Sequence, residues 1–209
     1  MGSNKIEAII FDLGGVILDI DYNRTVWAFQ DLGFERFDAL YSKMRQSGLF
    51  DQLEKGEIDK SAFVESLQKE IPNRTKDEIV NAWNAIILDF PVGRLDYVQK
   101  LRSKVPCYLL SNTNEIHLAY FNQLLNRAKK LQSIHECFDQ AYLSHEIHAR
   151  KPEHDAWQMI IDEHGLIPQK TLFIDDSPQH IDAANQLGLN TIHLTAIHDL
   201  EARLTPFLA

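Results

Sequence analysis

Short apolar runs that alternate with helix-like segments constrain the fold of this chain more than any other feature. From residue 95 onward, stretches with apolar spacing of three and four are interrupted by brief apolar runs at 106–110, 170–174 and 190–194. A similar run at residues 8–11 is too short for an isolated helix. Strands that alternate with helices predict a parallel sheet with helices on both faces. We therefore predict an α/β fold.

The segment between residues 21 and 90 differs from the rest because it shows helical patterns and no good strand. A purely helical block inside an α/β chain indicates an inserted bundle. We expect a core made of residues 1–20 and 91–209, with a helical insertion at residues 21–90.

Capping patterns mark helix starts inside this block. Asp59 is a plausible N-cap, and Thr75 with Glu78 three residues later forms a capping-box pattern. Residues 37–44 show helical apolar spacing. Residues 44–57 have the composition of a loop that could line a pocket.

Polar side chains follow four of the predicted strands or strand-like segments. They are Asp12, Ser111 with Asn112, Lys151, and Asp175 with Asp176. The carboxyl ends of parallel strands lie along one edge of a sheet, where ligands bind in open α/β folds. We therefore expect these residues to meet, although they are far apart in the sequence.

The chemistry of this set suits a metal and a phosphoryl group. Carboxylates placed close together raise one another's pKa, and a divalent cation removes that penalty. Ligands that are all oxygen atoms favour Mg²⁺, which often bridges to a phosphate. A lysine and a hydroxyl can neutralise and hydrogen-bond a phosphoryl group. An aspartate can attack phosphorus and form an aspartyl-phosphate, which water then hydrolyses.

Composition narrows the possible partners. The 209 residues carry a formal net charge of −9, which disfavours nonspecific binding to nucleic acid or to anionic membranes. The two cysteines, Cys107 and Cys137, lack a CxxC spacing and suggest reduced structural thiols. The chain shows neither a signal-peptide pattern nor an apolar run long enough to cross a membrane. We expect a cytoplasmic protein, monomeric or homodimeric, whose partner is a small phosphorylated metabolite.

Four short motifs carry a resemblance to a known family. They are FDLGGV at 11–16, LSNT at 110–113, RKPE at 150–153 and FIDDS at 173–177. In this order they resemble the four motifs of the haloacid dehalogenase-like hydrolases. The resemblance spans almost the whole chain and implies a Rossmann-like core with a helical cap inserted after the first strand. Residues 12–24, 50–58 and 111–114 are similar to the bacterial α-D-glucose-1-phosphate phosphatases of that family.

The resemblance assigns a metal site. Asp12 would be both the nucleophile and a ligand of Mg²⁺, and the backbone carbonyl of Gly14 would be a second ligand. Asp176 would bind the metal, with Asp175 beside it as a ligand or a support.

The resemblance also assigns the phosphate contacts. Ser111 and Asn112 would hold the phosphate, and Lys151 would balance its charge as a second catalytic residue. The implied function is a Mg²⁺-dependent phosphatase of small phosphorylated sugars, such as glucose 1-phosphate.

Position 14 departs from the family pattern, because many of its phosphatases have an aspartate there as general acid/base and Gly14 cannot transfer a proton. Asp19 and Asp21 are possible replacements, although a hinge role with capping of the next helix is the favoured interpretation. Two alternatives remain open: a 2-haloacid dehalogenase, and a non-catalytic phosphate-binding module that lacks the general acid.

Overall fold

The core of the protein is a parallel five-stranded sheet with the strand order β3-β2-β1-β4-β5. The structure is a computed structural model that describes residues 5–34 and 48–207. The strands are β1 (Ala8–Phe11), β2 (Cys107–Ser111), β3 (Gln140–Leu143), β4 (Thr171–Asp175) and β5 (Asn190–His193). The predicted α/β fold is therefore confirmed.

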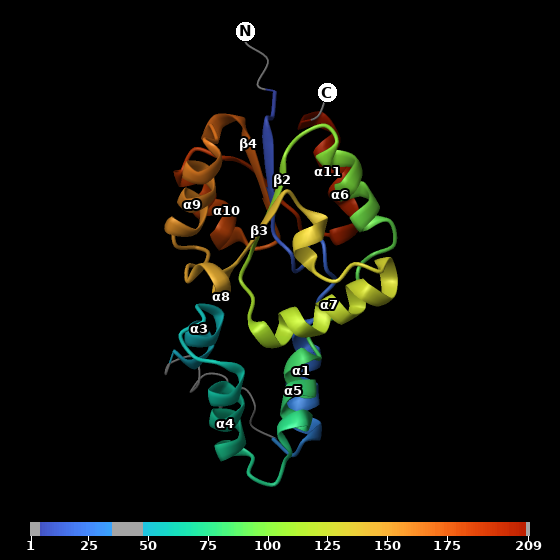
Figure 1. Cartoon of the computed structure of the whole chain (residues 1–209), viewed down its shortest axis with the longest axis vertical. Coiled ribbons are helices and arrows are strands. Elements are labelled where there is room, and N and C mark those ends of the chain that lie inside the picture. The colour runs from blue at the N-terminus through green and yellow to red at the C-terminus, as the bar shows by residue number, and fades with distance from the viewer. Residues whose placement is uncertain (1–4, 35–47, 208–209) are drawn as a thin grey trace.

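Helices cover both faces of the sheet (Figure 1). On one face lie α9 (Asp155–His164) and α10 (Pro178–Gln186), and on the other lie α6 (Arg94–Arg102), α7 (Glu115–Lys129) and α11 (Leu200–Leu204). Successive strand side chains point to opposite faces. In β1, Ala8 and Ile10 pack on the first face, whereas Ile9 and Phe11 pack on the second. The central strands β1, β2 and β4 are mainly apolar and fully buried, as expected for a sheet that is covered on both faces.

Short elements complete the core. They are α8 (Ser144–Ile147) and the 3₁₀ helices η1 (Ile134–Cys137), η2 (Pro168–Lys170), η3 (Ile197–Asp199) and η4 (Thr205–Phe207). In the part of the chain that the structure describes, no helix combines the length and the apolar character needed to cross a bilayer.

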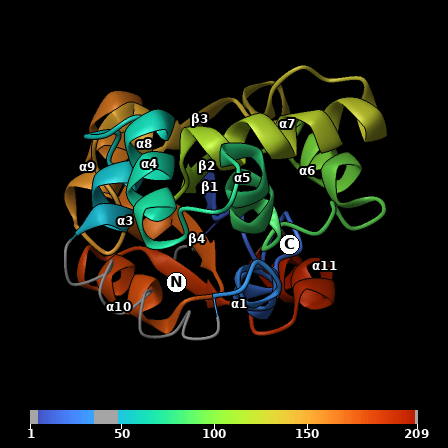
Figure 2. The same ribbon diagram turned by 90° about the horizontal axis from the view of Figure 1, so that it is seen from below.

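A group of helices lies between β1 and α6 in the sequence. It contains α1 (Tyr22–Asp31), α3 (Leu49–Glu54), α4 (Lys60–Glu70) and α5 (Lys76–Asn84). These helices share an apolar cluster that includes Phe29, Leu53, Phe63, Leu67 and Ile79. They lie beyond the end of the sheet toward which the strands run, and the view from below shows them in front of the strands (Figures 1 and 2).

The chain enters and leaves this insertion at adjacent points. Ile20 and Ile87 form an antiparallel bridge. Asp19 donates its N–H to the carbonyl of Asp89 at 2.9 Å, and Asp21 donates to that of Ile86 at 2.8 Å. We call these two paired segments, residues 19–21 and 86–89, the neck of the insertion.

The local predictions for the insertion have mixed outcomes. The caps are confirmed, because the Asp59 side chain accepts from the N–H of Ala62 and Thr75 forms a complete capping box with Glu78. The prediction of a loop at residues 44–57 was wrong over Leu49–Glu54, which form α3 with Leu49 and Leu53 buried against the insertion cluster. The predicted helix at residues 37–44 lies outside the described residues.

Helix α7 begins at a side-chain cap directly after the polar end of β2. The Asn114 carboxamide oxygen accepts from the N–H groups of Ile116 and His117, both at 3.1 Å, and Asn114 is 1% exposed. The cap therefore satisfies donors that the first turn of a helix leaves unpaired.

We expect Asn114→Ala to lower the free energy of unfolding by about 1–2 kcal/mol, because it removes a buried N-cap. Urea titration followed by circular dichroism measures this loss. Gln123→Ala, an exposed change on the same helix, should stay within about 0.5 kcal/mol of the wild type. A stability equal to that of the wild type for Asn114→Ala would contradict the capping role.

Candidate active site

The polar strand ends meet at a cavity of about 330 Å³ between the sheet edge and the insertion. Five of the seven predicted site residues line it: Asp12, Gly14, Ser111, Asn112 and Asp176. The other two, Lys151 and Asp175, are fully buried behind it: Lys151 contacts Asp12, and Asp175 contacts Lys151. The predicted convergence of these strand ends is confirmed.

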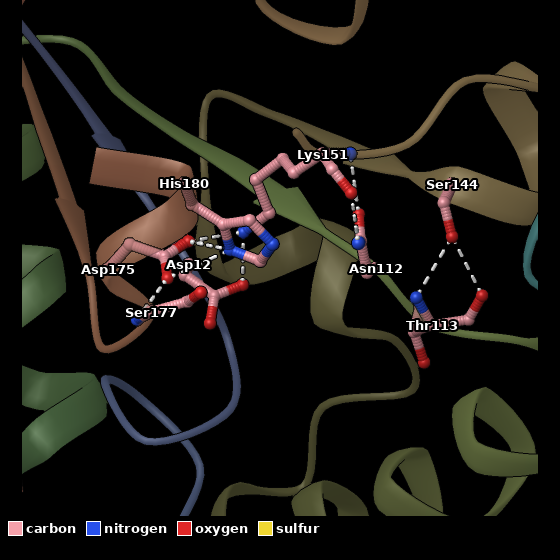
Figure 3. Close-up of polar contacts among 8 residues, drawn as sticks. All are labelled: Asp12, Asn112, Thr113, Ser144, Lys151, Asp175, Ser177 and His180. Carbon is pink, nitrogen blue, oxygen red and sulfur yellow. Dashed lines mark hydrogen bonds and ion pairs between the residues drawn. The ribbon is translucent and has the colours of Figure 1, made fainter. Parts of the chain in front are cut away.

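Lys151 is the buried centre of the site (Figure 3). Its Nζ lies 2.6 Å from Asp12 Oδ1 and 2.7 Å from Asp175 Oδ2, and its side chain is fully buried. The Phe173 ring adds a cation–π contact, with its centroid 5.4 Å from Nζ. Burial alone would lower the lysine pKa, but the attraction of Asp12 and Asp175 outweighs burial and raises the pKa. Lys151 is therefore held as a cation between two strands.

Asp175 is fully occupied by donors. Its Oδ1 accepts from the N–H of Ser177 at 2.8 Å, and His180 Nδ1 lies 3.0 Å from both carboxylate oxygens. Burial would raise the pKa of Asp175, but Lys151 and His180 together lower it to about 2. This carboxylate is ionised and is positioned chiefly to fix Lys151.

For Asp12 the net effect on the pKa is the opposite, a rise. Burial raises its pKa to about 7, Lys151 opposes the shift, and the neighbouring Asp175 and Asp176 add to it. The pKa of Asp176 is raised by burial and by Asp175. Without a cation, Asp12 and Asp176 are therefore harder to ionise, because they are buried and because their negative charges lie close together.

The three aspartates have the geometry and chemistry of a hard-metal site. Each of Asp12, Asp175 and Asp176 offers an oxygen, and these oxygens lie within 4.8 Å of one another. An all-oxygen donor set suits Mg²⁺. The residues present therefore fit the expected cation.

Gly15 allows Asp176 to approach the turn that carries Asp12. Its φ is +71°, and a Cβ at this position would lie 2.4 Å from Asp176 Oδ2. Any side chain at position 15 would therefore displace that carboxylate. At Gly14 a Cβ would lie 2.9 Å from Ile20 Cδ1, so the tip of Ile20 fills the space that a side chain would need there.

Asn112 has a different use from the predicted phosphate contact. Its side-chain nitrogen donates to the carbonyl of Lys151 at 2.8 Å, and its oxygen accepts from the N–H of Lys151 at 2.9 Å (Figure 3). Both polar atoms of the carboxamide thus fix the backbone of Lys151. The predicted contact between Asn112 and phosphate stays a prediction.

Two supporting residues were missed in the sequence. The Ser144 hydroxyl accepts from the N–H of Thr113 at 2.9 Å and donates to the carbonyl of Thr113 at 2.8 Å, which fixes the loop after β2. Ser144 directly follows β3 and was detectable as a further polar strand end. His180 lies on α10 five residues after Asp175, and only the spatial contact shows its role.

The acids considered as replacements for a general acid lie elsewhere. Asp21 caps α1 by accepting from the N–H of Asn23 at 2.9 Å. Asp19 lines a separate cavity with Asp89. Both agree with the hinge interpretation. Arg24 is exposed and lies 4.0 Å from Asp21.

The insertion side of the cavity is mainly apolar. Ile20, Ile86 and Ile87 of the neck line it together with Tyr22 and Glu54. His117 of α7 also lines it, and burial lowers the pKa of this histidine to about 4. His117 is therefore neutral and adds no charge to this wall at pH 7.

Comparisons with known proteins agree with the geometry. Residues 6–188 match the family model of the haloacid dehalogenase-like hydrolases. The D-ribitol-5-phosphate phosphatase of Bacteroides thetaiotaomicron is 32% identical over 206 residues, which cover 97% of this chain and 98% of that protein.

Solved structures show the same similarity. A haloacid dehalogenase family enzyme from Bacteroides thetaiotaomicron superposes with a TM-score of 0.83 and 32% identity, over 90% of this chain and 93% of that one. Another structure of that enzyme, in complex with magnesium and inorganic phosphate, gives a TM-score of 0.77 at 32% identity, with the same coverage of both chains.

The raised pKa of Asp12 predicts a pH-dependent stability. Because the folded pKa of about 7 lies above the reference value of 3.8, the folded state retains a proton that the unfolded state has lost. The stabilisation is present below pH 3.8 and is lost as the pH rises through 7. In chelator, we expect the unfolding free energy of the wild type to fall relative to Asp12→Asn over this range.

Urea titrations at several pH values measure this difference. His117 has the opposite pH dependence, because its pKa is lowered, but it is common to both proteins and cancels in the comparison. Stability curves that stay parallel from pH 4 to pH 8 would contradict the assigned shift of Asp12.

Proposed function

The chain belongs to the haloacid dehalogenase-like hydrolases, and from this premise we propose that it is a Mg²⁺-dependent phosphatase of a small phosphorylated metabolite. The observation that carries the proposal is the buried Lys151 between Asp12 and Asp175, with Asp176 completing a group of three carboxylates. The magnesium and phosphate bound to the similar enzyme of Bacteroides thetaiotaomicron support the same assignment.

Asp12 is the proposed nucleophile. A carboxylate oxygen of Asp12 attacks phosphorus, the ester oxygen leaves with its electron pair and takes a proton from solvent water to become the alcohol, and an aspartyl-phosphate remains. Water then attacks this phosphorus and releases phosphate, which restores the carboxylate. Lys151 holds Asp12 in place, while the Ser111 hydroxyl, which lines the cavity, donates to a phosphate oxygen.

Asp12, Asp176 and the Gly14 carbonyl are the proposed ligands of Mg²⁺, and Asp175 supports them through Lys151. When bound, the cation supplies positive charge that reduces the repulsion between the nucleophile and the phosphate. The carboxylate crowding seen at this site supports the assignment.

Position 14 offers no side chain that could donate a proton to the leaving alcohol. Gly14 has none, and Ile20 fills the adjacent space. General acid/base help is typically worth about 10²–10⁴-fold. We therefore propose that turnover is slow with esters whose alcohols are poor leaving groups.

The proposed substrate is a phosphate ester of a polyhydroxylated alcohol. The similarity to a D-ribitol-5-phosphate phosphatase supports an open-chain sugar-alcohol phosphate. It replaces glucose 1-phosphate, named from the motifs, as the first candidate.

The two alternatives have less support. A 2-haloacid dehalogenase would use the same aspartate on carbon without a metal, and it would not need the acidic group formed by Asp12, Asp175 and Asp176. A non-catalytic phosphate-binding module is favoured only by Gly14. Both are decided by the assay below.

We also propose the organisation expected from the sequence, with residues 1–20 and 91–209 as the catalytic core and residues 21–90 as a cap. The apolar cluster of the insertion, to which the core adds Ile116 of α7, and the paired neck support this division. The buried thiols of Cys107 and Cys137, which form no disulfide, agree with a proposed cytoplasmic location. A monomer or a homodimer remains our expectation.

The decisive experiment measures phosphate release from D-ribitol 5-phosphate, glucose 1-phosphate and p-nitrophenyl phosphate, with Mg²⁺ or with chelator. We expect Mg²⁺-dependent hydrolysis by the wild type. Asp12→Asn should lose at least about 10³-fold in kcat, because it removes the nucleophile. Asp182→Asn, an exposed change on α10, should retain full activity.

Equal rates for wild type and Asp12→Asn would reject the phosphatase. Halide release from 2-chloropropionate without Mg²⁺ would favour the dehalogenase. Binding of Mg²⁺ and phosphate without hydrolysis of any ester would favour the binding module.

A second prediction concerns Gly15. Gly15→Ala should lower kcat/KM by about 10²-fold, because the new Cβ displaces the Asp176 carboxylate and small misplacements in an active site are costly. Gly165→Ala is the matched control. Gly165 has a φ of +59° but no neighbour within 4 Å of an added Cβ.

Both variants should lose about 1–2 kcal/mol of stability from the left-handed backbone. Only Gly15→Ala should weaken the Mg²⁺ dependence of activity. A similar loss of kcat/KM in the two variants would show that the position of Asp176 does not depend on Gly15.

A further inference from the structure

The cavity has two chemically different ends. The core supplies Asp12, Asp176 and Ser111, where the phosphate is proposed to bind. On the opposite side the neck contributes isoleucines, and α3 contributes Glu54. Among the described residues that line the insertion side, Glu54 is the one carboxylate. The alcohol part of a bound ester would therefore face a mainly apolar wall with one acidic group, Glu54, and the Arg150 guanidinium beside it.

Glu54 is held in place from the core. Its Oε2 lies 3.0 Å from Nη2 of Arg150, and Arg150 also forms an ion pair with Asp51, one turn earlier on α3. Arg150 directly precedes Lys151 in the sequence. Two more contacts fix the same segment: Lys55 Nζ lies 2.7 Å from Glu153, and the Lys55 carbonyl lies 2.7 Å from His148 Nδ1. Glu54 is thus oriented relative to the catalytic lysine.

One carboxylate oxygen of Glu54 remains available. Oε2 is enclosed by protein and lies 3.0 Å from Arg150 Nη2 without forming a hydrogen bond. Over the described ranges no hydrogen bond engages Oε1 either. The side chain is 27% exposed and lines the cavity. Arg150 already lies beside this carboxylate, and a hydroxyl group of a bound ester can approach Oε1 from the cavity.

We propose that Glu54 is a specificity-determining residue that accepts a hydrogen bond from a hydroxyl group on the carbon chain of the substrate. The inference rests on the proposed phosphatase activity and deepens it. A carboxylate only accepts hydrogen bonds, so it favours chains rich in hydroxyl donors. It disfavours alkyl esters, which leave it unpaired, and esters with a second anionic group, which it repels.

The test compares three esters: D-ribitol 5-phosphate, n-pentyl phosphate without hydroxyls, and 6-phosphogluconate with an added carboxylate. For Glu54→Ala we expect kcat/KM for ribitol 5-phosphate to fall about 10- to 100-fold, the effect of a hydrogen bond to a charged group. Pentyl phosphate should change less than about 3-fold, because it makes no such bond. Glu54→Gln should raise kcat/KM for 6-phosphogluconate, because it removes the repulsion.

Glu57→Gln is the matched control, since Glu57 is an exposed acid three residues away, and it should leave all three values unchanged. Equal losses with ribitol 5-phosphate and pentyl phosphate in Glu54→Ala would show a structural role and overturn the proposal. Calorimetric binding of these two esters to wild type and Glu54→Gln gives a second readout, in which only ribitol 5-phosphate should bind more weakly to the variant.

This readout separates the two proposals. If the wild type hydrolyses none of the esters, the proposed function fails, and the binding data alone decide the role of Glu54. If the wild type hydrolyses pentyl phosphate and ribitol 5-phosphate with equal kcat/KM, the phosphatase stands and the specificity role is overturned.

Discussion

The buried ammonium group of Lys151 is the interaction on which the rest of the site depends. A buried cation needs partners to offset its desolvation, and Lys151 finds them in Asp12 at the end of β1 and Asp175 at the end of β4. Asn112, just after β2, clamps the lysine backbone at the same time. Through its side chain and its backbone, Lys151 therefore links the carboxyl ends of three strands. Asp12 consequently stays near a positive charge without losing its exposure to the cavity.

The sheet and the identity of most of the site were predictable from the sequence. Parallel strands place their carboxyl ends along one edge whatever the connecting helices do, so Asp12, Ser111 and Asp175 had to be neighbours once the strands were recognised. The use of each side chain was less predictable. The side chains of Asn112 and Ser144 form hydrogen bonds with the backbone of loops. These hydrogen bonds join segments that lie tens of residues apart in the sequence.

The insertion was the least predictable part. Most of its helices were predicted from capping and spacing, but α3 is only six residues long and its N-cap is Gly48, which offers no side-chain cap. Its position depends on ion pairs with Arg150 and Glu153 of the core. Local sequence does not report contacts at such separations. The apolar cavity wall formed by Ile20 and Ile87 likewise follows from the pairing of the neck, which no periodicity revealed.

The paired neck also has a consequence for how such proteins diversify. Because residues 19–21 and 86–89 lie side by side, removing or exchanging everything between them would leave two chain ends that a short turn could join. The sheet and the lysine network would keep their connectivity. New insertions can then replace the old one while the reaction centre stays unchanged, provided that they match or replace the contacts of α3 with Arg150 and of α5 with α7. If the insertion determines the substrate as proposed, the substrate can change in evolution while the catalytic core stays the same.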